Sequence, residues 1–247
     1  SALAEALLQN DAARARLAAE IAAQMAEKGY AGLDVDFEYL PGQSAAAYAD
    51  FIRQLREALS PGGAPVTVAL APQTSAGQAG LLYEGHDYAA LGAAADYCLL
   101  MTYEWGYAYS APMAVSPIPK IRQVLDYAVT AIPPKKLLLG ISSYGYDWPL
   151  PYAQGKTRAR SIGCQQAITI AREHGAEIFF DEAAQAPYFR YTAEEQAHEV
   201  WFEDARSIRA KLGLAAQYGL AGVGYWNLMR PFPQNWQGLD ALCPIRP

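Results

Sequence analysis

The chain has 247 residues, of which 52% are hydrophobic and 18% are charged, and its formal net charge is −6. This composition is typical of a globular protein with a large core, and it excludes disordered, collagen-like and coiled-coil chains. The negative charge argues against nucleic acid or an anionic membrane as a partner, because such partners need a basic patch. No apolar run approaches the roughly 18 residues that a membrane span needs.

Three cysteines, Cys98, Cys164 and Cys243, are odd in number and far apart in the sequence. Their spacing predicts neither a disulfide framework nor a paired metal site. We expect each to be a small buried residue. We expect no metal and no cofactor, and residue 1 is not followed by the basic and apolar regions of a signal peptide.

Helical and strand patterns alternate along most of the chain. The first 29 residues are rich in alanine with apolar residues at helical spacing, and we expect Asp11 to cap a helix that Gly29 ends. Apolar and acidic residues then alternate over 32–40, which predicts a strand. The further elements, in chain order, are a helix over 44–59, a strand over 65–72, a short helix over 86–94, a strand over 96–105, a helix over 116–132, a strand over 136–146, a helix over 204–218, a strand over 220–228 and a short helix over 235–242.

The alternation changes between residues 147 and 203. A predicted helix over 164–173 is followed by three short strand-like segments, AEIFFD, APYFRYT and QAHEVWFED. Short strands in close succession are typical of antiparallel structure. We therefore predict an α+β insertion over 147–203, between one strand and the next outer helix, with βα units over 1–146 and 204–247.

Strands that alternate with helices predict an α/β fold with a parallel sheet. The predicted strands start about 30–40 residues apart, so eight such units and the insertion would exceed the ~250 residues of a bare (β/α)8 barrel. Only five such strands can be found in the sequence. The count therefore predicts either part of a barrel or a smaller open sheet.

The sharpest chemical feature is a row of acids, Asp34, Asp36 and Glu38, in the strand predicted over 32–40. Alternation places the three on one face of the strand. Like charges this close raise at least one pKa, and a carboxyl that stays protonated near neutral pH can act as a general acid. The alternatives are a solvated edge strand, which the flanking helix–strand units argue against, or a metal site, which usually draws carboxylates from several elements.

These residues carry a resemblance to a known family. GLDVDFE (32–38) resembles the catalytic strand of glycoside hydrolase family 18, the chitinase-like family, whose pattern is D-x-x-D-x-D-x-E. The first acid of that pattern would fall at Ala31, where this sequence departs from it. The segment MTYEW (101–105) resembles the family's M-x-Y-D/N motif, with Glu104 in place of Asp or Asn.

Further segments follow in the family's order. GISSYGYDW (140–148) resembles the seventh strand, and YW (225–226) resembles the aromatic end of the eighth. YGYDWPLPY, DEAAQAPYFRY and YWNLMRPFPQNW are similar to the branch of the family that lyses bacterial spore cortex during germination. The resemblance implies a (β/α)8 TIM-type barrel that lacks strands 1–3 in this chain, which then begins before the third barrel helix, and an α+β insertion after strand 7. Five strands would leave two open edges, through which we expect either self-association or a barrel open on one side.

The resemblance also implies roles for individual residues. Glu38 would protonate the glycosidic oxygen, and Asp36 would orient the 2-acetamido group of the substrate, whose carbonyl oxygen attacks the anomeric carbon. Tyr103 would hydrogen-bond that acetamido group as charge develops. The implied substrate-binding residues are Asp34, behind Asp36, together with Glu104, Trp226, Met101 and Trp105, of which Met101 packs against the sugar or the core.

The implied function is retaining hydrolysis of β-1,4 bonds at N-acetylglucosamine in peptidoglycan or chitin-type oligosaccharides, outside the cell, in a cell wall or spore envelope. Two alternatives stay open. One is a catalytically silent lectin that binds amino sugars or a protein, although such proteins usually lack the acid found here at Glu38. The other is an ordinary two-carboxylate glycosidase that uses Glu38 with Glu104 and needs no 2-acetamido group.

Other polar residues give weaker signals. The three histidines, His86, His174 and His198, show no ligand spacing, and we expect them to be surface or hydrogen-bonded residues. Arg158 and Arg160 lie in a polar segment and are expected to be solvated, with an acidic glycan as the alternative partner.

Overall fold

The computed structural model describes residues 2–242, so Cys243 and the last residues of the segment predicted over 204–247 lie outside it. The chain divides into two compact units, each described here by itself. Unit 1 consists of Ser1–Met101, Gln123–Leu139 and Tyr218–Gly222. Unit 2 consists of Thr102–Arg122, Gly140–Gln217 and Val223–Pro247.

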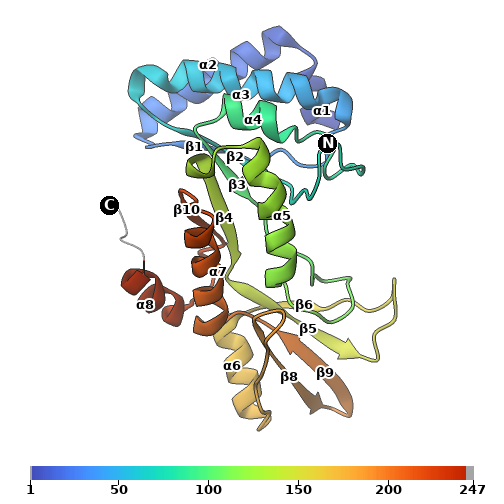
Figure 1. Cartoon of the computed structure of the whole chain (residues 1–247). Coiled ribbons are helices and arrows are strands. Elements are labelled where there is room, and N and C mark those ends of the chain that lie inside the picture. Colours follow the sequence, from blue (N-terminus) through green and yellow to red (C-terminus); the bar gives the residue numbers. More distant parts are fainter. Residues whose placement is uncertain (1, 243–247) are drawn as a thin grey trace. The chain divides into compact units, whose positions relative to one another are not determined.

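The strands within residues 2–242 form two five-stranded sheets (Figure 1). The first has the order β1-β2-β3-β4-β10, so that β1 and β10 are its end strands. The pairs β1/β2, β2/β3 and β3/β4 are parallel, which confirms the expected parallel sheet. These strands are β1 (Leu33–Val35), β2 (Val66–Leu70), β3 (Tyr97–Leu100), β4 (Leu137–Ser142) and β10 (Gly222–Trp226).

The N-terminal segment forms two helices, α1 (Ala2–Leu8) and α2 (Asp11–Lys28). The helix predicted to end at Gly29 is α2, whereas no separate boundary was predicted for α1. Asn10 caps α2, because its extended backbone at φ −122° lets its side chain accept from the Ala13 N–H. Asp11, the expected cap, is the first helical residue. The predicted stop at Gly29 is confirmed: its φ of 70° is left-handed, and its N–H bonds the carbonyl of Met25.

The remaining helices of unit 1 build its core. The helix α3 (Ala45–Leu59) buries one apolar stripe, consisting of Tyr48, Phe51, Ile52, Leu55 and Leu59. Strand β2 lies beside it in the contacts of this unit and buries four of its five residues. The shorter helix α4 is Tyr88–Ala94, and α5 is Ile118–Ala131. Single 3-10 turns occur at Gly42–Ser44, Ser60–Gly62 and Pro134–Lys136.

The second sheet belongs to unit 2 and is antiparallel, with the order β6-β5-β9-β8-β7. The helix predicted over 164–173 and the three following strands are confirmed. The strand predicted over 136–146 was wrong in one respect, because β4 ends at Ser142 and the next strand joins the other sheet. The elements of this unit are β5 (Tyr144–Leu150), β6 (Arg160–Gly163), α6 (Cys164–Glu173), β7 (Phe179–Asp181), β8 (Ala186–Ala193), β9 (Gln196–Trp201), α7 (Ala205–Gln217) and α8 (Pro233–Leu242).

Each face of the antiparallel sheet carries its own apolar cluster. One cluster joins the sheet to α6 and α7, and includes Ile162, Cys164, Ile170, Phe189, Val200, Ile208 and Leu212. The other joins it to the segment after β3, and includes Ala114, Val115, Tyr144, Tyr146, Trp148 and Trp201. Along β5, Tyr144, Tyr146 and Trp148 therefore face the segment after β3. Asp147 points to the opposite face.

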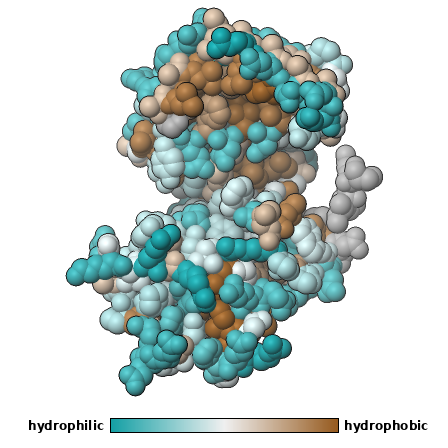
Figure 2. All heavy atoms as spheres, turned by 180° about the vertical axis from the view of Figure 1, so that it is seen from behind, coloured by the Kyte–Doolittle hydropathy of each residue, from teal (hydrophilic) through white to brown (hydrophobic). Residues whose placement is uncertain are grey.

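Among residues 2–242 no helix has the length and apolar character that crossing a membrane requires. The two cysteines in this range, Cys98 and Cys164, are both buried and free, as expected. Figure 2 shows the side of the molecule turned away in Figure 1. In that view apolar residues gather in one brown area that polar residues border.

Candidate functional site

The acidic row lies at the carboxyl end of β1. Strand β1 ends at Val35, so the strand predicted over 32–40 is shorter than expected, and only Asp34 of the three acids is within it. Val35 is buried whereas Asp34 and Asp36 are exposed, which is the expected alternation. After Val35 the chain leaves the ladder, and the Phe37 ring stacks on Tyr48 of α3 at 5.6 Å between centroids.

The pKa values of Asp34, Asp36 and Glu38 are all raised above the ordinary carboxyl values. Partial burial is the larger cause at each of them, although Asp34 and Asp36 still reach solvent. The charge of Asp36 adds to the shift at Asp34 and at Glu38. The predicted upward shift is therefore confirmed in direction, but desolvation contributes more to it than repulsion between the acids.

A buried histidine holds the backbone between two of these acids. His86 lies in the segment between β2 and α4 and is 1% exposed. Its Nδ1 accepts from the Ala71 N–H at 2.9 Å, so the proton is on Nε2, which donates to the Phe37 carbonyl at 2.8 Å. Burial lowers the pKa of His86, which keeps the ring neutral in this arrangement. Phe37 separates Asp36 from Glu38.

The segment that carries His86 is itself fixed by buried polar groups. Gln73, 4% exposed, donates its side-chain amide to the carbonyls of Tyr83 and His86 at 2.7 and 2.8 Å. The Tyr88 hydroxyl donates to the Ala71 carbonyl at 2.6 Å. The backbone of His86 and that of Ala71, which donates to the imidazole, are thereby both held in place.

In unit 2, a second group of predicted residues follows β3. Glu104 is exposed, and its carboxylate accepts hydrogen bonds from the hydroxyls of Tyr144 and Tyr146, the latter at 3.0 Å. Burial, with the nearby Glu104 charge as the second cause, raises the pKa of both tyrosines, so both remain proton donors. Glu104 has a φ of 68°, a left-handed conformation that is uncommon for its residue type.

The residues beside Glu104 differ in exposure. Tyr103 is half-buried against the apolar cluster that contains Tyr144 and Trp148. Trp105 is also half-buried, and its N–H donates to the Val115 carbonyl at 3.0 Å. In unit 1, Met101 is 8% exposed, so its side chain packs in the core.

Trp226 ends β10 and is 54% exposed. Its carbonyl accepts from the Ser143 N–H at 3.0 Å, and the Ser143 hydroxyl donates to the Asn227 carbonyl at 2.6 Å. An exposed indole on a backbone held at two consecutive residues is suited to stacking against a ligand. Unit 1 thus holds Asp34, Asp36, Glu38 and Met101, whereas unit 2 holds Tyr103, Glu104, Trp105 and Trp226.

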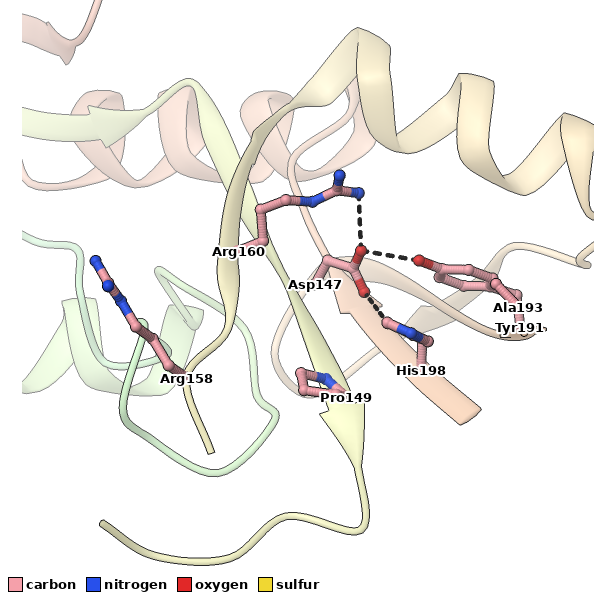
Figure 3. A pocket seen from close by; sticks show the side chains of 7 residues that line it. All are labelled: Asp147, Pro149, Arg158, Arg160, Tyr191, Ala193 and His198. Atoms are coloured by element: carbon pink, nitrogen blue, oxygen red, sulfur yellow. Dashed lines mark hydrogen bonds and ion pairs between the residues drawn. The ribbon is translucent and has the colours of Figure 1, made fainter. Parts of the chain in front are cut away.

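A further polar cluster surrounds Asp147 on the other face of β5 (Figure 3). This carboxylate is 3% exposed and accepts from Arg160 of β6, Tyr191 of β8 and His198 of β9, at 3.1, 2.9 and 2.8 Å. The three partners and Arg158 line a surface pocket of about 390 Å³. The sequence did not predict this cluster. Its four residues lie on four different strands, β5, β6, β8 and β9, which come together only in the folded sheet, so no local motif contains them.

Within the described residues no group of three or more His, Cys, Asp and Glu side chains is arranged to hold a metal ion.

Comparison with known proteins identifies the family. The sequence profile described as "Glycosyl hydrolases family 18" matches residues 5–230, which include the acidic row, Tyr103, Glu104 and Trp226. This chain belongs to glycosyl hydrolase family 18. The resemblance inferred from the sequence motifs is therefore confirmed.

Relatives within family 18 include the "Cortical fragment-lytic enzyme" of Bacillus subtilis (strain 168), which is 49% identical over 93% of this chain and 54% of that protein. The crystal structure of the spore cortex-lytic enzyme SleL of Bacillus megaterium QM B1551 superposes with a TM-score of 0.93 and 42% identity, over 98% of this chain and 56% of that one. The chain thus spans about half the length of these relatives.

A chitinase of the same fold extends the comparison. The crystal structure of the chitinase from Chromobacterium violaceum ATCC 12472 has a TM-score of 0.88 and 28% identity, over 98% of this chain and 75% of that one. This family 18 chain is thus similar both to cortex-lytic enzymes and to a chitinase, so peptidoglycan and chitin are the two candidate substrates.

Proposed function

We propose that this chain carries the catalytic residues of a retaining glycoside hydrolase that cleaves β-1,4 bonds at N-acetylglucosamine. The observation that carries the proposal is the acidic row after β1, in which the pKa of Glu38 is raised by burial and by Asp36. A carboxyl that holds its proton toward neutral pH can protonate a leaving oxygen. The name of the Bacillus subtilis relative favours peptidoglycan over chitin as the polymer.

Glu38 is the proposed general acid, and the substrate's own 2-acetamido group is the proposed nucleophile. In this scheme the acetamido carbonyl oxygen attacks the anomeric carbon while Glu38 protonates the departing oxygen, and an oxazolinium ion forms. Asp36 orients the acetamido group and stabilises its positive charge. Asp34 lies behind Asp36, and their mutual repulsion favours one shared proton.

The residues of unit 2 have binding roles in this proposal. Tyr103 donates to the acetamido oxygen as charge develops, Glu104 binds a sugar hydroxyl, and Trp226 stacks on the sugar. Each lies at or just beyond the end of a strand of the first sheet, where catalytic residues of (β/α)8 barrels are found. Trp105 is a further proposed contact. The buried Met101 would support the site from the core.

We also propose that the five strands of the first sheet correspond to strands 4–8 of the family's barrel, with an insertion over 147–203 after the seventh. The end positions of β1 and β10 support self-association through their edges. A cortex-lytic relative supports a place in the spore envelope or cell wall.

The two-carboxylate alternative would need Glu104 as nucleophile. The Glu104 carboxylate already accepts from two tyrosine hydroxyls, and hydrogen bonds that stabilise a carboxylate lower its nucleophilicity. This arrangement favours a binding role for Glu104. The lectin alternative predicts no hydrolysis by the unmodified chain.

The test compares hydrolysis of N-acetylglucosamine oligomers and of soluble peptidoglycan fragments by the unmodified chain and by Glu38→Gln. We expect the substitution to lower kcat by about 10²–10⁴-fold or more, with the affinity for the oligomer largely kept. Glu20→Gln, which removes an exposed carboxylate of α2, is the matched control and should not change kcat. Near-full activity of Glu38→Gln would overturn the assignment of the acid.

A further inference from the structure

The segment directly after Glu104 exposes two aromatic rings. Tyr107 is 41% exposed and Tyr109 is 53% exposed, and their rings meet edge to face at 6.2 Å. Apolar ring surface left in water is unfavourable, because burying it would contribute to stability. Exposure of both in one short turn therefore needs a reason.

The two arms of this loop, residues 105–106 and 113–115, are hydrogen-bonded to each other and tightly packed. The N–H groups of Trp105 and Gly106 donate to the carbonyls of Val115 and Ala114, both at 3.0 Å. A Cβ at Gly106 would lie 2.2 Å from the Met113 carbonyl oxygen, so the close approach of the two arms requires glycine there. At the tip, the Tyr107 N–H donates to the Ser110 hydroxyl at 2.9 Å.

The tip is also held by neighbouring parts of the chain, which donate hydrogen bonds to three consecutive backbone carbonyls of the tip. The carbonyls of Ala108, Tyr109 and Ser110 each accept a hydrogen bond from the chain between β5 and β6 or from β5 itself. In the same order, the donors are the Ala159 N–H at 2.7 Å, the Tyr152 hydroxyl at 3.0 Å and the Trp148 indole N–H at 2.7 Å. The two tyrosines are therefore presented on a fixed backbone.

A cation accompanies the rings. The guanidinium of Arg158 lies 5.8 Å from the centre of the Tyr109 ring, within cation–π range. Arg160, two residues later, is paired with the buried Asp147. Arg158 has no ion pair with any described residue, and Figure 3 shows it extending to the opposite side of the segment from Arg160. Both arginines line the same pocket, so Arg158 offers an unpaired charge at its rim.

We propose that Tyr107, Tyr109 and Arg158 form a binding site for a carboxylate-bearing amino sugar, with the sugar on the tyrosine rings and the carboxylate on the guanidinium. The inference rests on the proposed function and extends it to the choice of polymer. Chitin carries no carboxylate, whereas every second sugar of peptidoglycan has a lactyl ether that ends in a carboxylate or a peptide. This site would therefore favour peptidoglycan.

The first test is a selectivity ratio, kcat/KM for carboxylate-bearing peptidoglycan fragments divided by kcat/KM for N-acetylglucosamine oligomers. We expect Arg158→Met to lower this ratio about fivefold, the range of an exposed ion pair. Arg172→Met removes an exposed charge of α6 in the same unit and should leave the ratio unchanged. An unchanged ratio in Arg158→Met would overturn the proposal.

The second test does not depend on hydrolysis. The probes are the disaccharide of N-acetylglucosamine and N-acetylmuramic acid and its amidated form, titrated calorimetrically into Glu38→Gln. We expect the acid form to bind about fivefold tighter at low salt, and the preference to disappear in Glu38→Gln/Arg158→Met and at high salt. Tyr109→Phe should keep the preference and Tyr109→Ala should weaken binding of both forms.

Equal binding of the two forms by Glu38→Gln would overturn the site. If the unmodified chain hydrolysed neither glycan, the proposed function would fail, while a preference for the acid form would still support the site. Far-ultraviolet circular dichroism of each variant checks that the fold is kept.

Discussion

Lys211 of α7 donates from Nζ to the Oε2 atom of Glu203 at 2.7 Å, and neither side chain reaches solvent. The Ser142 hydroxyl at the end of β4 donates to the other carboxylate oxygen at 3.2 Å. Burial raises the pKa of Glu203, and the lysine ammonium opposes that shift. This buried pair ties α7 to the residues before it and to β4 within unit 2.

Breaking this pair from one side should be strongly destabilising. We expect Lys211→Met to lower the free energy of unfolding by about 3–5 kcal/mol, because it leaves the Glu203 carboxylate buried without a counter-charge. The double variant Glu203→Leu/Lys211→Met should recover most of the loss, since it removes both charges. Urea unfolding followed by tryptophan fluorescence measures both. A double variant no more stable than the single one would contradict this account.

His86 is expected to act as a positioning residue for the acids that flank Phe37. Gln could accept from the Ala71 N–H and donate to the Phe37 carbonyl, so His86→Gln should keep most of kcat, whereas His86→Phe should lower it by about tenfold or more. The readout is kcat and KM measured separately. If His86 served stability alone, His86→Phe would be less stable than His86→Gln, but the folded variants would have the same kcat.

The same histidine predicts a pH dependence of stability. Its pKa is lowered in the folded chain, so the unfolded chain takes up the proton first as the pH falls. The contribution of His86 is therefore complete above about pH 6.5, the ordinary histidine pKa, and declines as the pH falls below it. When the pH is lowered from 7.5 to 5.5, the free energy of unfolding should fall more in the unmodified chain than in His86→Gln.

The ionised acids at the end of β1, Asp34, Asp36 and Glu38, should lower the free energy of unfolding at neutral pH. Their pKa values are raised in the folded chain, so their contribution to stability is largest below the ordinary carboxyl pKa and declines as the pH rises through the shifted values. We expect Asp34→Asn to raise or maintain the melting temperature at pH 7 while it lowers kcat. Glu177→Gln, at an exposed position before β7, is the control and should change neither the melting temperature nor kcat. A marked loss of stability in Asp34→Asn at pH 7 would contradict this prediction.

The mechanism can be tested with a stable mimic of the oxazolinium ion. A thiazoline derived from N-acetylglucosamine has the fused ring of that ion and a basic nitrogen that can share a proton with Asp36, so it should inhibit competitively and bind more tightly than the substrate. Steady-state inhibition kinetics provide the measurement. An active chain that the thiazoline does not inhibit would favour catalysis by Glu38 and Glu104.

The open ends of the first sheet predict association. Strand β1 has an unpaired edge among the described residues, and parallel edges of this kind pair readily with other chains. We expect the 247-residue chain to elute as a dimer or larger species in size-exclusion chromatography with light scattering, and to have low activity. A Leu33→Lys variant at this edge should shift the population toward monomer. A fully active monomer of the unmodified chain would refute the prediction.

The sequence predicted most elements because their signals are local. Gly29 ends α2 by its left-handed conformation, and alternation assigned Val35 and the acids to opposite faces. The change of sheet at Ser143 has no such signal, because residues 136–146 are uniformly strand-like. After Ser143 the chain pairs with β9, which lies far along the sequence. The two strands approach closely at Gly145, where a Cβ would lie 2.2 Å from the carbonyl oxygen of Trp201, 56 residues later.

The candidate site was predictable to a similar extent. The family motifs identified the acids, Glu104 and Trp226, because each motif is a short run of residues at fixed spacing. The contact of His86 with the acidic segment was not predicted, since its hydrogen bonds join Ala71 and Phe37, which are distant in sequence. The tyrosine donors to Glu104 were seen only as aromatic residues near strand ends, because a hydroxyl and its acceptor 40 residues away leave no common pattern.

The tip that presents Tyr107 and Tyr109 is fastened through its main chain, because the three anchored groups are all carbonyls. Every residue type has that group, so mutation can replace the tyrosines without disturbing the anchor. Substitutions here can therefore change the ligand preference of the site while the backbone keeps its position. For protein engineering, the same property makes the tip a cassette in which libraries of side chains can be screened against glycans of different charge.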